Sequence, residues 1–150
     1  MSVAIHEADL QFKVYGMPVA QGSKKVIRGH LIEMADARLR TWRQDVAGAA
    51  SEAMAGTLPY SEPVSLRLNF FLPRPRGHFG SGKNKEKLKP SAPEFPGVHP
   101  DLDKLARSVL DALTHIAFHD DKQVVMLTLA KFYADEDFRP GMMAGMTVLR

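Results

Sequence analysis

The chain of 150 residues contains no cysteine. Disulfides, thiolate nucleophiles and zinc–thiolate centres are therefore excluded, and any metal ion must be held by oxygen or imidazole ligands. The sequence also has no run of about 18 apolar residues, the length needed to cross a bilayer. The first ten residues include Glu7 and Asp9 and lack the basic and apolar pattern of a secretion signal. We therefore expect a cytoplasmic protein without a membrane segment.

The formal net charge is only +3, which by itself does not indicate a polyanionic partner. The basic residues are unevenly distributed, however. The segment 73–100 contains only two acidic residues, and its basic residues are Arg74, Arg76, Lys83, Lys85, Lys87 and Lys89. A second cluster, in GSKKVIRGH, consists of Lys24, Lys25 and Arg28. Such clusters either bind phosphates or keep an exposed loop soluble.

Apolar periodicity predicts the secondary structure. Alternation predicts strands at residues 10–17, 64–70, 124–133 and 145–149, and a short hairpin arm through Val26 and Leu31. Thr41 and Gln44 have capping-box spacing and predict a helix ending near Gly56, with Trp42, Val46, Ala49 and Ala53 on its buried face. A second helix is expected after Asp103, with an apolar stripe formed by Leu105, Val109, Ala112, Leu113 and Ile116.

The segment 73–100 is rich in proline, glycine, lysine and serine, and this composition predicts a long basic loop. Loops of this length inside a domain are usually functional or disordered. The order of elements predicts an α+β protein. We expect a single domain over residues 1–150, with two helices packed on one face of a mostly antiparallel mixed β-sheet.

Carboxylates concentrate in HPDLDKLARSVLDALTHIAFHDDKQVV, residues 99–125. Pro100 favours an extended chain at Asp101, and on an extended chain residues i and i+2 point the same way. Asp101 and Asp103 are therefore expected to face one site, with Asp103 as the N-cap of the helix. Two adjacent carboxylates repel each other unless a cation lies between them, and Mg²⁺ is such a cation. Asp121 would supply a third ligand if its turn folds back on the helix start.

Each of these acids also has a purely structural interpretation. Asp103 would cap the helix, Asp120 and Asp121 would form a turn, and Asp111 would pair with Arg107. These interpretations explain the residues one at a time. They do not explain why the capping carboxylate has a second carboxylate beside it.

The runs DLDKLARSVLDAL and DDKQVV resemble the RusA family of Holliday junction resolvases, whose pattern is D-L-D-N-L, a helix with D-A-L, and then D-D-x-Q-V. The resemblance is close over about 25 residues. The QGSKK loop and the helix opening at Trp42 are similar to the branch of the family found in phages and prophages.

The resemblance implies a small homodimeric endonuclease that uses Mg²⁺ or Mn²⁺ to make paired, symmetric cuts in four-way DNA junctions. The acidic residues of the family fall on Asp101, Asp103 and Asp121. The functional lysine of the family falls on Arg107, which keeps the charge but cannot act as a neutral base. Lys104 stands where the family has asparagine, and either Lys104 or Arg107 would neutralise phosphate charge in the transition state.

Two other functions stay open at this stage. The chain could be a DNA-binding protein with a structural divalent ion and no hydrolytic activity. A pair of carboxylates acting on a glycoside is disfavoured, because a basic loop has no role there and the single tryptophan offers little sugar stacking. His99 and His119 flank the aspartates without the spacing of a transition-metal site, and His115 is expected to contact helix carbonyls.

Overall fold

The main β-sheet has the strand order β1-β6-β4-β5, and a separate two-stranded hairpin pairs β2 with β3. The computed structural model describes residues 8–22, 24–28, 30–33 and 37–150, with the backbone alone for residues 24–27 and 30–33. The elements are β1 (Leu10–Tyr15), β2 (Lys24–Ile27), β3 (His30–Glu33), α1 (Ala37–Met54), β4 (Val64–Leu72), α2 (Leu102–Leu113), β5 (Val124–Tyr133) and β6 (Gly141–Val148).

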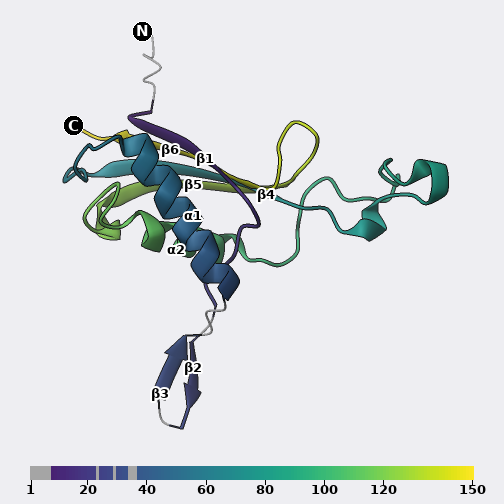
Figure 1. Cartoon of the computed structure of the whole chain (residues 1–150), viewed down its shortest axis with the longest axis horizontal. Coiled ribbons are helices and arrows are strands. Elements are labelled where there is room, and N and C mark those ends of the chain that lie inside the picture. The colour runs from purple at the N-terminus through teal and green to yellow at the C-terminus, as the bar shows by residue number, and fades with distance from the viewer. Residues whose placement is uncertain (1–7, 23, 29, 34–36) are drawn as a thin grey trace.

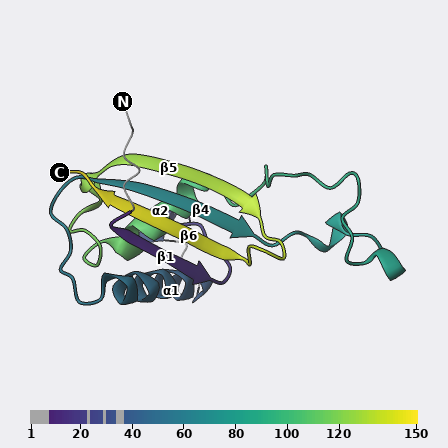
Figure 2. The ribbon, with the colours of Figure 1, turned by 90° about the horizontal axis from the view of Figure 1, so that it is seen from above.

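Three strand pairs build the main sheet. β6 pairs antiparallel with both β1 and β4, whereas β4 and β5 are parallel. Figures 1 and 2 show α1 and α2 on one face of this sheet. The predicted α+β class, with two helices on one face of a mostly antiparallel mixed sheet, is therefore confirmed.

The hydrophobic core lies between this face and the two helices. Alternate residues of β4 point toward the helices, and Val64, Leu66, Leu68 and Phe70 are buried as the alternation predicted. Trp42 of α1 and Leu105 of α2 are buried against them. Within the part of the chain that the structure describes, no helix covers the opposite face of the sheet (Figure 2).

The first helix begins earlier than predicted. It runs from Ala37, so Thr41 lies inside the helix and is not its N-cap. Leu39 provides an additional buried position one turn before Trp42, and leucine and arginine favour the helical conformation. The predicted face is only partly correct, because Ala50 and Met54 are buried, while Ala49 is half-buried and Ala53 is exposed.

Other boundaries also differ from expectation. The last strand begins at Gly141, four residues before the predicted start, because residues 141–146 of β6 pair with both β1 and β4. Ile116 lies beyond the end of α2 and is half-buried in the turn that follows. The strand Val124–Tyr133 is as predicted, and so is the hairpin through Val26 and Leu31.

The segment 73–100 is a long loop, as predicted. In Figure 1 it extends away from the sheet, while the β2-β3 hairpin projects in another direction. It contains two single-turn 3-10 helices, Arg76–His78 and Gly82–Asn84. Backbone hydrogen bonds from Lys89 N to His78 O (2.9 Å) and from Gly80 N to Lys87 O (2.9 Å) join its two arms. The loop therefore has a defined internal structure.

Gly141 provides a direct test of the sheet. Its φ of +151° is unfavourable for residues with a side chain, and a Cβ there would overlap the carbonyl oxygen of Val14. We expect Gly141→Ala to lower the free energy of unfolding by about 3 kcal/mol or more. Gly48→Ala is the matched control, because Gly48 lies on α1 with open space around its Cα, and alanine there should stabilise by about 0.5–1 kcal/mol. Urea denaturation measures both, and an unchanged stability of Gly141→Ala would contradict the described pairing.

Candidate active site

The second helix starts at Leu102, with Asp101 at the N-cap position. Asp101 is extended (φ −70°, ψ 138°), and its carbonyl accepts the first helical hydrogen bond from Leu105 N at 3.0 Å. The prediction that Asp103 is the N-cap is therefore wrong, and Asp103 lies in the first turn instead. The extended spacing that was expected to align Asp101 with Asp103 consequently does not apply. A carboxylate in the first turn is still stabilised by the helix dipole.

The ring of His99 and the ammonium group of Lys104 lie beside the Asp101 carboxylate. His99 Nδ1 lies 3.0 Å from Oδ1, and Lys104 Nζ lies 3.6 Å from Oδ2. All three side chains are well exposed, so these contacts contribute little to stability. Asp101 and Lys104 thus lie together as the sequence suggested, with the carboxylate open to solvent.

Asp103, Arg107 and Asp111 form an exposed stripe along α2, because residues four apart share one helix face. The proposed pairing of Asp111 with Arg107 is wrong. Asp111 Oδ2 instead accepts a hydrogen bond of 2.6 Å from Arg43 Nη2 of α1, an ion pair that connects the two helices. Arg107 consequently stays on the exposed face one turn from Asp103, where it can meet an anionic ligand.

Asp121 lies at the other end of the helix. The turn after α2 leads into a 3-10 helix, Asp121–Gln123, just before β5. A helix of 12 residues is about 18 Å long, so this turn does not fold back on Asp101 and Asp103. Among the described residues, no three His, Cys, Asp or Glu side chains lie close enough to hold a metal ion together. Asp101 and Asp103 provide oxygen donors suited to a hard cation, but a single chain does not bring the third aspartate to them.

Gln123 fixes the Asp120–Asp121 turn. Its Oε1 accepts from His119 N (2.9 Å) and Asp120 N (3.0 Å), while its Nε2 donates to Tyr60 O (2.8 Å) and Glu62 O (2.9 Å). One amide side chain therefore ties the turn to the chain that leads into β4. Asp120 caps the 3-10 helix by accepting from Lys122 N, and this hydrogen bond lowers the pKa of Asp120. The predicted turn at these two aspartates is confirmed.

Lys131 is a site residue that the sequence analysis missed. It lies on β5, and its Nζ donates to Val98 O (2.6 Å) and Pro100 O (2.9 Å), directly ahead of Asp101. A sequence signal was present, because Lys131 follows Leu127 and Leu129 at alternate positions that point toward the helices. A lysine at such a position needs acceptors, and here the backbone before Asp101 provides them.

The predicted DNA-contacting residues fall into three groups. The side chains of Lys24 and Lys25 lie outside the described residues, although their backbones belong to β2, and Arg28 is exposed. The chain leading to this hairpin contacts α2 near the aspartates, because Gln21 N donates to Lys104 O at 3.0 Å.

The other two groups lie in the long loop. Arg74 and Arg76 are engaged within the loop, since Arg74 Nη1 donates to Pro93 O (2.7 Å) and Arg76 Nη1 to Lys85 O (2.9 Å). The lysines are all exposed and comprise Lys83, Lys85, Lys87 and Lys89. The loop therefore presents its lysines to solvent while its arginines contribute to its own structure.

Comparisons with known proteins connect this arrangement to a family. The family model described as endodeoxyribonuclease RusA matches residues 16–140. The chain is also 38% identical over 129 residues to the uncharacterized protein YqaN of Bacillus subtilis (strain 168), covering 85% of this chain and 89% of that protein. Among the described residues, no helix is long and apolar enough to span a membrane.

We predict that Lys131→Met loosens the segment that positions Asp101. Losing two hydrogen bonds from a charged donor should cost about 2 kcal/mol and leave the carbonyls of Val98 and Pro100 without their partner. Proteolysis near residues 96–101 should become faster, as measured by mass spectrometry of timed digests. Lys13→Met is the matched control, because Lys13 is exposed on β1. Equal cleavage rates for the two variants would contradict this role of Lys131.

Proposed function

Because the chain belongs to the RusA endodeoxyribonuclease family, we propose that it cuts phosphodiester bonds in four-way DNA junctions with the help of Mg²⁺ or Mn²⁺. The observation that supports this most directly is the start of α2. Two aspartates lie there two residues apart in the sequence, with Lys104 and Arg107 close by. Asp101 and Asp103 correspond to two acidic residues of the family pattern and Arg107 to its functional lysine, while Lys104 adds a positive charge where the family has asparagine.

The residues at this site suit the proposed reaction. Asp101 and Asp103 would hold the metal ion, which when bound supplies a Lewis acid and lowers the pKa of a water molecule. Lys104 would then exchange its contact with Asp101 for one with a phosphate oxygen. Arg107 presents a fixed pair of donors suited to the charge that develops on the scissile phosphate, and it has no role as a proton acceptor.

The basic segments provide a phosphate-binding surface around this site. The β2-β3 hairpin starts from chain that is hydrogen-bonded to Lys104, and the long loop ends at Pro100, directly before Asp101. DNA that lies along either segment passes the two aspartates. We assign the four exposed lysines of the loop to sequence-independent phosphate contacts, together with Lys24, Lys25 and Arg28 of the hairpin.

A homodimer would bring Asp121 to the site. β5 lies at the edge of the sheet and has no neighbour on its outer side among the described strands, and Val125, Met126 and Leu127 are exposed on it. An exposed apolar edge strand is suited to pairing with a second chain. Two-fold pairing of β5 with the β5 of a second copy is antiparallel, so the start of one strand meets the end of the other. Lys131 holds the segment before Asp101 near that end. Asp121 of the partner subunit would therefore approach Asp101 and Asp103.

Replacement of Asp103 tests the nuclease. We expect Asp103→Asn to reduce cleavage of a labelled four-way junction in Mg²⁺ by at least about 100-fold, because a neutral amide weakens metal binding and charge stabilisation. Binding to the junction in EDTA should be retained. Asp45→Asn, an exposed position on α1, is the matched control and should cleave normally.

Two results would contradict the proposal. Normal cleavage by Asp103→Asn would remove Asp103 from the reaction. Junction binding by the wild-type chain without any cleavage in Mg²⁺ or Mn²⁺ would leave a DNA-binding protein without hydrolytic activity, the second function that the sequence left open.

Mixing two inactive variants tests whether each site uses both subunits. Asp103→Asn and Asp121→Asn should each be inactive as homodimers. If each site takes Asp101 and Asp103 from one subunit and Asp121 from the other, a heterodimer of the two variants carries both substitutions in one of its two sites. Its other site is then intact. Random assortment of an equal mixture would therefore restore about a quarter of the sites. The restored activity should appear as single nicks in the junction.

The control is a mixture of Asp101→Asn with Asp103→Asn, in which every shared site carries a substitution and no activity should return. Differently tagged subunits allow heterodimers to be purified before the assay. Heterodimers of Asp103→Asn and Asp121→Asn that remain inactive would show that the three aspartates do not combine across an interface.

A further inference from the structure

A cavity of about 590 Å³ opens near the ends of β4 and β5, and phenylalanines form much of its wall. Phe71 of β4 and Phe132 of β5 lie side by side in the sheet, with ring centroids 5.7 Å apart. Phe138, from the connection between β5 and β6, stacks on Phe71 at 4.9 Å with an interplanar angle of 5°. Phe95 of the long loop approaches Phe132 at 6.4 Å. Four rings from four separate parts of the chain thus meet around one space.

Local hydrogen bonds hold the two outer rings in place. The Asp135 carboxylate accepts from Asp137 N and Phe138 N, both at 2.8 Å, and so closes the turn that carries Phe138. Arg74 Nη1 donates to Pro93 O at 2.7 Å and fixes the loop two residues before Phe95. The rings nevertheless remain accessible, because Phe95 is 58% and Phe138 45% exposed. Their exposed surface is unfavourable in water unless a ligand covers it.

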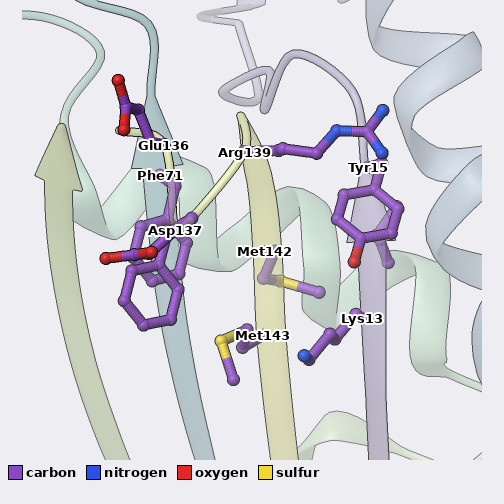
Figure 3. Close-up of a pocket in the computed structure, with 10 residues that line it drawn as sticks. Lys13, Tyr15, Phe71, Glu136, Asp137, Arg139, Met142 and Met143 are labelled. Atoms are coloured by element: carbon purple, nitrogen blue, oxygen red, sulfur yellow. The ribbon is translucent and has the colours of Figure 1, made fainter. Parts of the chain in front are cut away.

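The neighbouring rings of Tyr133 and Tyr15 are each covered by an arginine side chain. The Arg74 guanidinium lies 4.3 Å above the ring of Tyr133, and Arg139 lies 4.5 Å above the ring of Tyr15. Figure 3 shows the second contact in the smaller adjoining cavity, where Arg139 reaches over Tyr15 while Glu136 and Asp137 lie toward Phe71. The aromatic surface that remains free is therefore concentrated on Phe95 and Phe138.

The polar lining favours a neutral ligand over a phosphate group. Glu94 and Asp135 lie on the wall of the cavity and would repel an anion, whereas Arg74 on the same wall is already engaged with Pro93 O and the ring of Tyr133. Asn69 contributes an amide that can both donate and accept hydrogen bonds. A flat heteroaromatic ring with polar edges suits such a site. Exposed lysines flank Leu88, another residue of the lining, and can hold the phosphates on either side of that ring.

We propose that this cavity binds a nucleobase of unpaired DNA, stacked against Phe95 and Phe138. The inference rests on the proposed action on DNA and assigns a second contact, separate from the phosphodiester being cut. The cavity and Asp101 lie at the same end of β5, because Phe132 lines the cavity while the adjacent Lys131 holds the segment before Asp101. Successive residues of a strand point to opposite faces of the sheet. A DNA strand that is unpaired at a branch point would thus have its backbone near the aspartates on one face of the sheet. One of its bases would lie in the cavity on the opposite face.

Binding of an oligothymidine single strand, measured by fluorescence anisotropy beside a duplex of equal length, tests this assignment. Phe95→Ala and Phe138→Ala should each weaken single-strand binding by about 5- to 100-fold and leave duplex binding unchanged. The salt dependence should stay as in the wild type, because no phosphate contact is lost. Phe95→Trp should retain binding. Leu58→Ala is the control, since Leu58 is 81% exposed and does not line the cavity.

Replacing Lys83, Lys85, Lys87 and Lys89 together by alanine provides the opposite signature, a loss of affinity for both DNA forms with a flatter salt dependence. Thermal melting confirms that each variant is folded. Single-strand binding by the two phenylalanine variants equal to that of the wild type would overturn the inference. A change in sedimentation of these variants, with unchanged DNA binding, would also overturn it and would indicate that a second copy of the chain covers the cavity.

Junction cleavage by the wild type, measured in the same preparations, separates this inference from the proposed function. If the wild type cleaves junctions but Phe95→Ala and Phe138→Ala bind single strands as the wild type does, only the inference about the cavity is contradicted. Single-strand binding that depends on Phe95 and Phe138, without cleavage of any junction, supports the inference and contradicts the nuclease.

Discussion

The parallel pairing of β4 with β5 determines where the other parts of the candidate site lie. Two parallel strands cannot be joined by a tight turn, because the chain must return to the end of the sheet at which the first strand began. Here the connection consists of the long loop followed by α2, and the return passes over the core face of the sheet (Figure 2). As a result, the loop and the start of α2 lie near the carboxyl ends of both strands, and the Asp120–Asp121 turn lies at the opposite end.

Lys131 links this topology to the chemistry. It lies on the edge strand and donates to two carbonyls of the segment that leads into α2. A charged donor bonded to backbone acceptors holds its position more firmly than an ion pair between exposed side chains. The exposed contact of Asp101 with Lys104 can therefore exchange for a ligand, while the backbone that carries Asp101 stays in place. The backbone of the site is thus held in place, while the ionic contact of Asp101 with Lys104 is free to be replaced by a contact with a ligand.

The two faces of the sheet have different roles near this end. On the helix side, packing against α1 and α2 buries the apolar residues of the core, and Lys131 at the end of β5 has backbone carbonyls as acceptors. On the other side, no helix among the described residues covers the sheet, and the rings of Phe71, Phe132 and Phe138 pack together there. Alternation along β5 places Lys131 on one face and Phe132 on the other, so one strand contributes to both.

The sequence by itself determined the class of the protein and its motifs. Alternation identified β4, because one face of that strand is buried against the helices, and the predicted bounds of β5 match the structure. Helical periodicity identified most of the buried stripe of α2, and the two aspartate motifs indicated the family. These signals are local, because they depend on spacing within a single element and on the residue types that a strand or a helix face requires.

Only the tertiary structure decided which of these residues meet. The pairing of Asp111 with Arg43 instead of Arg107, and the separation of Asp121 from Asp101, both follow from how α2 lies against α1 and β5. The N-cap fell on Asp101 because the carbonyl of Asp101 accepts the first helical hydrogen bond, a choice between two aspartates that spacing alone did not resolve. The cavity of four phenylalanines likewise depends on contacts between residues up to 67 positions apart, and no local pattern encodes such contacts.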